Sequence, residues 1–347
     1  MALRDLLRAE IQKKSFTACA YCILKDTEIT ELEALGRTGE DYLGEEINEE
    51  TLFDMASVTK PVVVATVMGQ LIESGKISLT TKVRDIEEAF RPPDKSKITL
   101  GQLLNHTSGL LWWSPLYKDC RSPLEAVRKI GSMQLEYRPG SKEIYSDLGY
   151  IALGVILEKL EGARLDEVAH RRVFEPIGMR YTRYLPDAHK YKIVLTEKYA
   201  NRPWGPGLVH DENCYFLGGI TGHAGMFSNI LDVSKFAREL LRRNEKSFPA
   251  SAIRMFHDRS NASLGGDHSY GWMFNTGPTT SFGAGFPENS IGHTGYTGTG
   301  LWLDLDSGFA TILLTNRVFY GREAQRILEV RRSFNNEATK LYLSHRI

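Results

Sequence analysis

Residues 53–75, with the sequence FDMASVTKPVVVATVMGQLIESG, constrain the fold more than any other stretch. Positions 62–68 offer almost no polar face, so a helix here must be buried on all sides rather than laid on a surface. Pro61 is tolerated in a first helical turn, where its missing amide has no intrahelical partner, and Gly75 is a good C-terminal stop. The sequence therefore predicts a central, buried helix that begins near residues 57–58.

Two polar residues, Ser57 and Lys60, lie one turn apart at the N-terminal end of this predicted helix and share a face. A lysine there gains nothing from the helix dipole and loses hydration on burial. An amine whose pKa is lowered by burial and by the positive helix end can take the proton of a serine hydroxyl, and the same helix end can stabilise an oxyanion. The structural alternative is that Lys60 reaches solvent and Ser57 caps the helix.

The 347-residue chain is too long for one ordinary core, which predicts two domains or one sheet domain with a large insertion. Its 43 basic residues balance 43 acidic ones, so charge gives no reason to expect a nucleic-acid partner or an anionic membrane. The N-terminus is charged throughout, and no apolar run approaches a membrane span. As written, the sequence predicts a cytoplasmic protein, exported only if a signal has been trimmed, and leaves the oligomeric state open.

Strand patterns occur near both ends of the chain. The runs 17–24 and 28–35 predict a hairpin at a sheet edge, and three later runs predict antiparallel strands around 270–274, 298–305 and 309–315. Between them, helices are expected over 99–104, 148–160, 165–174 and 231–242, and a last helix over 323–342. The predicted fold class is α+β, with an antiparallel sheet built from both termini, flanked by helices, and a mostly helical inserted domain. We expect a sheet domain of residues 1–75 and 255–347, a helical domain of residues 76–254, and an active site in the cleft between them.

Cys19 and Cys22 form a C-x-x-C pattern, which occurs in metal and redox sites. They lie in a predicted strand, where residues three apart face opposite sides, so we interpret them as buried free thiols.

Two other groups of residues have alternative interpretations. The aromatics Trp112, Trp113 and Tyr117 can line a cleft or cover a core, and we favour the core. Four histidines and an aspartate lack metal-ligand spacing, which favours capping or packing roles. They are His106, His210, His223, His293 and Asp211.

Two further segments give Ser57 and Lys60 a context. Tyr145 precedes Ser146 and Asp147 at the mouth of a predicted helix, and HTGY at 293–296 leads into a predicted strand. In this order, the three segments resemble the Ser-x-x-Lys, Tyr-x-Asn and Lys/His-Thr-Gly signatures of the penicillin-recognising serine hydrolases. The resemblance is closest to the branch of class C β-lactamases, D-alanyl-D-alanine carboxypeptidases and related esterases. It covers about residues 51–317, with supporting segments at 103–110, 139–140, 175–179 and 222–228.

The resemblance implies a β-lactamase/transpeptidase-like fold and a role for each matched residue. Ser57 would be the acylated nucleophile and Lys60 its partner in proton transfer, while Tyr145 would pass the serine proton to the leaving group. The backbone amides of Ser57 and Tyr296 would hold the oxyanion, with Tyr296 on the strand that follows the glycine. The implied substrate-binding residues are Asp147, His293, Thr294 and Gly295. No cofactor and no metal are expected.

Two departures from the family signatures bear on the chemistry. Asp147 replaces the asparagine, and a carboxylate only accepts hydrogen bonds; near Lys60 it would favour the charged ammonium and shift weight onto Tyr145 as the base. His293 replaces the lysine of many β-lactamases, so the positive charge that would face a β-lactam carboxylate is lost or depends on pH.

The sequence thus predicts a serine hydrolase that acts through an acyl-enzyme at Ser57 on a small ester, amide or D-amino-acid peptide. The alternatives are a β-lactamase or D-alanyl-D-alanine carboxypeptidase proper and, from another class, a non-catalytic binding or scaffold relative in which Asp147 has disabled the site. Family membership fixes the reaction class and leaves the substrate open.

Overall fold

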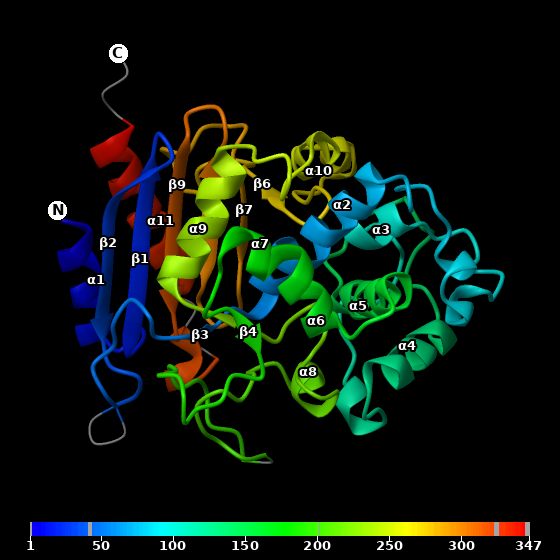
Figure 1. Cartoon of the computed structure of the whole chain (residues 1–347), viewed down its shortest axis with the longest axis horizontal. Coiled ribbons are helices and arrows are strands. Elements are labelled where there is room, and N and C mark those ends of the chain that lie inside the picture. The colour runs from blue at the N-terminus through cyan, green and yellow to red at the C-terminus, as the bar shows by residue number, and fades with distance from the viewer. Residues whose placement is uncertain (1, 41–43, 201, 323–325, 344–347) are drawn as a thin grey trace.

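The computed structural model describes residues 2–40, 44–200, 202–322 and 326–343. A six-stranded antiparallel sheet, in the order β2-β1-β9-β8-β7-β6, brings the two ends of the chain together (Figure 1). Its strands are β1 (Ala18–Lys25), β2 (Glu28–Gly36), β6 (Met273–Phe274), β7 (Ile291–Thr294), β8 (Gly300–Asp304) and β9 (Phe309–Thr315). The predicted fold class and the edge hairpin are confirmed.

Helices cover both faces of this sheet (Figure 1). On one face α1 (Leu3–Gln12) packs beside α11 (Ile327–Tyr342), and on the other α9 (Ile230–Leu241) packs against β1 and β9. Alternate residues of β1 enter two different cores, because successive side chains of a strand point to opposite faces. Cys19 and Cys22 therefore lie in different cores as buried free thiols, which confirms their predicted state. The predicted start of the last helix, at 323–325, lies outside the described residues.

The rest of the chain forms a small second sheet and a group of helices beside the first sheet (Figure 1). The second sheet has the order β3 (Phe53–Asp54), β5 (Met226–Ser228), β4 (Arg183–Tyr184). The helices are α3 (Leu100–Leu104), α4 (Pro123–Ser132), α5 (Asp147–Glu161), α6 (Leu165–Ala169), α7 (Glu175–Ile177), α8 (Glu212–Phe216) and α10 (Ala250–Phe256). The sequence patterns predicted α3, α5 and α6 but missed α4, α7, α8 and α10. The division into two domains stays a prediction.

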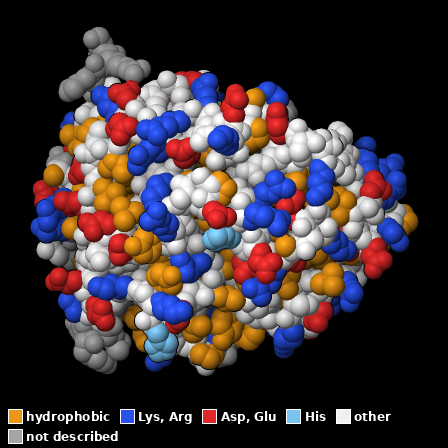
Figure 2. Space-filling model, in the orientation of Figure 1, with side chains coloured by type: hydrophobic (Ala, Val, Ile, Leu, Met, Phe, Trp, Pro, Cys, Tyr) orange, Lys and Arg blue, Asp and Glu red, His pale blue; other side chains and the backbone are white. Residues whose placement is uncertain are grey.

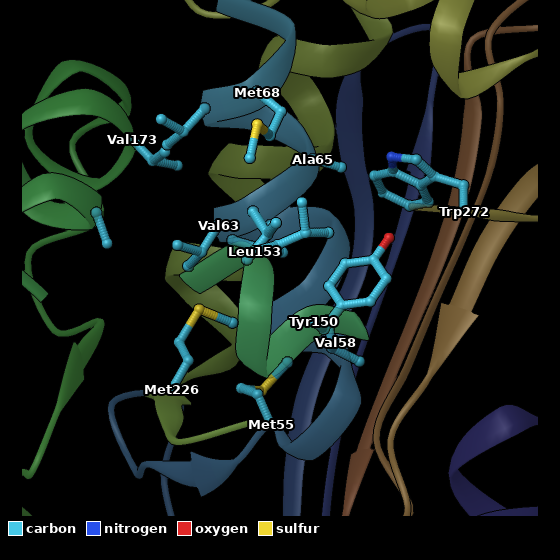
Figure 3. Packing of buried hydrophobic residues seen from close by; sticks show 14 of the residues in the cluster. Met55, Val58, Val63, Ala65, Met68, Tyr150, Leu153, Val173, Met226 and Trp272 are labelled. Atoms are coloured by element: carbon cyan, nitrogen blue, oxygen red, sulfur yellow. The ribbon is translucent and has the colours of Figure 1, made fainter. Parts of the chain in front are cut away.

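The central helical segment is buried as predicted. It begins with a 3-10 turn at Ala56–Val58, passes through a wide π-helical turn at Lys60–Ala65 and continues as α2 (Thr66–Glu73), which ends before Gly75 at φ +71°. All of its side chains from 58 to 68 are buried. Figure 3 shows its apolar side chains packed among residues of α5, the β5 strand and Trp272. Ser57 and Lys60 thus lie in the first turn of a buried central helix.

Charged side chains of both signs are mixed over the face seen in Figure 2, as the balanced composition suggests. Within the residues that the structure describes, no helix combines the length and the apolar character needed to cross a membrane.

Candidate active site

Ser57 follows a strained and tightly held backbone turn. Ala56 has φ +45°, an uncommon conformation for a residue with a side chain. The buried Asp54 carboxylate accepts hydrogen bonds from the amide of Ala56 at 2.8 Å and from the amide of His210 at 2.6 Å. These bonds fix the path of the chain as it leaves β3 and enters the central helix, and so they fix the position of Ser57.

Lys60 is fully buried, and its Nζ makes three polar contacts. It donates to Ser57 Oγ at 2.9 Å and to the carbonyl of His223 at 3.2 Å, and it forms an ion pair with Asp147 Oδ1 at 2.7 Å. Burial alone would lower the pKa of Lys60, but the Asp147 carboxylate and then Tyr145 outweigh it and raise the pKa above its usual value. The pKa of Lys60 is thus raised rather than lowered, and the contact with Asp147 favours the charged ammonium.

Tyr145 lies directly beside this ammonium. Lys60 Nζ is 4.8 Å from the centre of the Tyr145 ring. Burial raises the pKa of Tyr145, the Lys60 charge lowers it and the Asp147 charge raises it, with a net increase. His106 packs against the ring, with centroids 4.5 Å apart, and its Nδ1 accepts a hydrogen bond from the Ser146 amide at 3.0 Å. Of the histidines discussed above, His106 thus has the packing role that the sequence favoured.

His293 and Thr294 lie at the end of β7, on the same site as Ser57. His293 Nδ1 is 3.0 Å from the carbonyl of Thr294, to which it donates, so its buried Nε2 is left as an acceptor without a partner among the described residues. Burial, followed by the Lys60 and His268 charges, lowers the pKa of His293 well below its usual value. The ring is therefore neutral, and the positive charge that a lysine would supply here is absent.

Tyr296 is in the turn between β7 and β8, not on a strand. The prediction of a strand is wrong because β7 ends at Thr294 and pairing resumes only at Gly300. Within the described chain the Tyr296 amide has no acceptor, which leaves it available to a ligand. Gly295 is required at this point, since a Cβ there would lie 2.2 Å from Thr299 Oγ1 and 2.6 Å from the Met55 carbonyl.

Polar side chains tie this turn to the segment that carries Ser57. Thr297 Oγ1 donates to the carbonyl of Asp54 at 2.7 Å, and Thr299 Oγ1 donates to that of Met55 at 3.1 Å. From α11, the buried Arg331 donates through Nη2 to the carbonyls of Gly295 at 2.7 Å and Thr299 at 2.8 Å. These hydrogen bonds fix the position of the Tyr296 amide relative to the Ser57 amide.

Sequence reasoning missed an ion-pair cluster beside Tyr145, centred on the buried His268. His268 Nδ1 lies 2.8 Å from Glu143 Oε1 and 2.7 Å from Asp267 Oδ1, and its ring is 5.2 Å from the Tyr145 ring. Burial lowers the pKa of His268, but Asp267 and Glu143 raise it to about 9. An imidazolium therefore faces Tyr145 at neutral pH. Because Nδ1 donates to both carboxylates, we assign the cluster as an ion pair. The sequence signal for it was limited to the adjacent residues Asp267 and His268.

Two cavities open on Ser57. The smaller, of about 310 Å³, is lined by Ser57, Tyr145, His268, Met273, His293, Thr294, Gly295, Tyr296, Arg317, Ile327 and Arg331. The larger, of about 440 Å³, is lined by Ala56, Ser57, Trp112, Trp113, Tyr145, Asp147, His210, Asp211, Glu212, His223, Ala224, Tyr296 and Arg322. Trp112 is 58% exposed, so the interpretation of the tryptophans as core cover is wrong and they line the cleft. All residues predicted for the site border one or both cavities, except Lys60, which lies behind them.

The remaining predicted polar residues have structural partners. Asp211 caps α8 by accepting from the Cys214 amide at 2.8 Å, and it also contacts His223 Nε2 at 2.8 Å. His210 Nε2 is 2.9 Å from Glu197 Oε2. Capping and packing roles are thus confirmed for these residues, although they also form part of the larger cavity wall.

Comparisons with known proteins identify relatives of this chain. The family model described as beta-lactamase matches residues 3–335. A Bacillus subtilis (strain 168) protein named N-acetylmuramyl-L-alanine amidase is 30% identical over 352 residues, which cover 87% of this chain and 77% of that protein. An Escherichia coli (strain K12) protein named for D-alanyl-D-alanine carboxypeptidase activity is 29% identical, covering 85% and 77%.

Solved structures share the fold at lower identity. The structure of EstCE1, described as a hydrolase with promiscuous acyltransferase activity, superposes with a TM-score of 0.77 at 20% identity, covering 96% of this chain and 97% of that one. At this identity the likeness concerns the fold alone.

Proposed function

The chain belongs to the beta-lactamase family of hydrolases, and on that premise we propose that it is a serine hydrolase whose nucleophile is Ser57. The observation that carries the proposal is the 2.9 Å hydrogen bond between Lys60 Nζ and Ser57 Oγ at the meeting point of two cavities. A buried lysine held on a serine hydroxyl, with a tyrosine beside both, is an arrangement that nucleophilic catalysis requires and that capping does not.

In the proposed reaction, Ser57 Oγ attacks the carbonyl carbon of a small ester, amide or D-amino-acid peptide. The developing oxyanion accepts hydrogen bonds from the amides of Ser57 and Tyr296. Lys60 stays protonated and holds the serine oxygen, because Asp147 keeps its pKa high.

Tyr145 is the proton carrier in this proposal. Its phenolate, flanked by the Lys60 ammonium and the His268 imidazolium, takes the serine proton and passes it to the leaving group. Tyr145 then takes a proton from the water that attacks the acyl-enzyme, and it returns this proton to Ser57 Oγ as the bond between the acyl carbon and that oxygen breaks. Because the pKa values of Lys60 and Tyr145 are both raised, the base form increases only as the pH rises into the alkaline range.

The names of the relatives support amide substrates. One is named as an amidase and one for carboxypeptidase activity, and both align with most of this chain. The neutral His293 removes a cation that would face a β-lactam carboxylate, so we expect weaker β-lactam hydrolysis than in β-lactamases proper. We therefore favour a peptidase, amidase or esterase over a β-lactamase.

Hydrolysis of p-nitrophenyl acetate tests the proposal. Wild-type protein should turn the ester over, and Ser57→Ala should lose that turnover while keeping its circular dichroism spectrum and melting temperature. The matched control is Ser263→Ala, an exposed serine outside both cavities, which should keep full activity. Full activity of Ser57→Ala would reject the proposal, and a wild type with no turnover of any ester or amide would favour the non-catalytic scaffold.

A further inference from the structure

One oxygen of Asp147 remains available in the larger cavity. Oδ1 is buried and forms the ion pair with Lys60 at 2.7 Å, which is its one polar contact. The other oxygen, Oδ2, makes no hydrogen bond or ion pair with the residues that the structure describes. The side chain is 17% exposed and lines the cavity together with Ser57. A substrate acylated on Ser57 would therefore meet a free carboxylate oxygen.

That oxygen lies close to where the acyl group must sit. Ser57 Oγ and Asp147 Oδ1 both contact the same nitrogen of Lys60. The carbonyl carbon of an acyl-enzyme is bonded to Ser57 Oγ, and a substituent on its α-carbon is two bonds further on. The α-substituent of the acyl group is thus within reach of Asp147.

A carboxylate discriminates between α-substituents because it only accepts hydrogen bonds. An ammonium group would donate a charge-assisted bond to Asp147. An N-acylated amine presents a carbonyl oxygen as well, and a carboxylate repels that oxygen, whereas an asparagine amide could donate to it.

The charges on the cavity wall favour a cation. Three carboxylates line it, Asp147, Asp211 and Glu212, and one guanidinium, Arg322. Arg322 is itself bound to Glu212 at 2.7 Å and to Glu197 at 2.9 Å. If the Lys60 ammonium behind Asp147 is counted with Arg322, three carboxylates still face two fixed cations.

Aromatic rings complete this wall. The lining includes Trp112 and Trp113, whose rings are 5.9 Å apart. It also includes Tyr296, but that ring already has the Arg317 guanidinium at 4.2 Å and the His210 ring at 5.7 Å, so the two tryptophans are the rings open to a cation. The faces of such rings attract cations. Their exposure and the carboxylates together make this the side of the site suited to a small cationic group.

We propose that the larger cavity selects acyl groups with a protonated amine on the carbon next to the scissile carbonyl, held by Asp147. The substrates would be amides, esters or short peptides with an unblocked N-terminal amino acid. This inference rests on the proposed function of Ser57, and it names the substrate class of that same site.

The test compares three p-nitroanilides that differ only at the α-carbon: alanine p-nitroanilide, its N-acetyl derivative and propionic acid p-nitroanilide, with alanine in both configurations. For the preferred configuration, wild-type protein should show a kcat/KM for the free amine that is about 10- to 100-fold above both others, as one charge-assisted hydrogen bond provides. Asp147→Asn should bring the ratio of free to acetylated substrate to about one or reverse it.

The ratio is the readout because Asp147→Asn also alters Lys60, which acts on all three substrates alike. The matched control is Glu212→Gln, which removes a wall carboxylate already paired with Arg322 and should keep most of the preference. An equal loss of the ratio in both variants would overturn the assignment to Asp147.

Failure of the inference is distinguishable from failure of the proposed function. If p-nitrophenyl acetate is hydrolysed through Ser57 but the free amine has no advantage, or is not turned over, the inference is wrong and the proposed function stands. If neither the acetate ester nor any anilide is turned over through Ser57, both the inference and the proposed function are wrong.

Discussion

Replacing Arg331 by methionine should slow catalysis while leaving the protein folded. Arg331 Nη2 donates to the Gly295 carbonyl at 2.7 Å, and that carbonyl belongs to the peptide group whose amide is the proposed oxyanion donor of Tyr296. Without this bond the Gly295 carbonyl is held by the Gly298 amide alone, at 3.0 Å, and the peptide can shift away from the oxyanion. Loss of one oxyanion donor costs about 10²–10³ in kcat, and a misplacement costs about 10²-fold, so we expect kcat to fall by about 10- to 100-fold with a smaller change in KM.

The stability of this variant follows from two opposing terms. Burial and the neighbouring Arg317 lower the pKa of Arg331 to about 9, which corresponds to about 5 kcal/mol against the charged form. The two hydrogen bonds to carbonyls return about 1.5–3 kcal/mol each. Both carbonyls also keep a backbone donor, at 3.0 Å for Gly295 and 2.8 Å for Thr299. The free energy of unfolding should therefore stay within about 2 kcal/mol of the wild-type value at pH 7.

Ester hydrolysis and urea denaturation measure the two effects on the same samples. Because a guanidinium keeps its proton in proteins, Arg331 carries its burial penalty throughout the assay range, and the methionine carries none. Unchanged kcat would refute the positioning role, and a loss of more than about 4 kcal/mol at pH 7 would refute the balance of terms.

Three other predictions concern the site. Because the pKa values of Lys60 and Tyr145 are raised, kcat/KM for p-nitrophenyl acetate should increase with pH above neutrality. Asp147→Asn removes a charge that raises both pKa values, so it should move that increase to lower pH. A pH profile that is flat above neutrality would contradict this prediction. Trp112→Ala should change the free energy of unfolding by less than about 0.5 kcal/mol but raise KM for bulky acyl esters and not for acetate, as steady-state kinetics would reveal. Asp54→Ala leaves two buried amides without their acceptor, at about 1–3 kcal/mol each, so urea denaturation should detect a loss of about 2–6 kcal/mol.

The fold and the position of the nucleophile could be predicted because they depend on local pattern. The apolar run at 62–68 requires burial on all sides, and the strands at both ends carry clear β patterns that pair in one sheet. Ser57, Tyr145 and His293 were recognised from short ordered motifs, and the structure brings them to the same cavity.

The missed features depend on partners distant in sequence. The sign of the pKa change at Lys60 follows from a 2.7 Å contact with Asp147, which spacing along the chain cannot give. The raised pKa of His268 depends on Asp267 beside it and also on Glu143, which comes from another segment of the chain. Arg331 reaches the Tyr296 turn from the last helix, and an arginine on a helix gives no signal of such a contact. The exposure of Trp112 likewise depends on how an irregular segment folds.

Labelling by a fluorophosphonate ester tests the central claim most directly, because this reagent phosphonylates an activated serine and forms a stable adduct. Intact mass and peptide mapping should show one adduct on wild-type protein, located at Ser57, and none on Ser57→Ala under the same conditions. Equal labelling of the two proteins, or ester hydrolysis by a wild type that never becomes labelled, would contradict the account of Ser57 as the nucleophile.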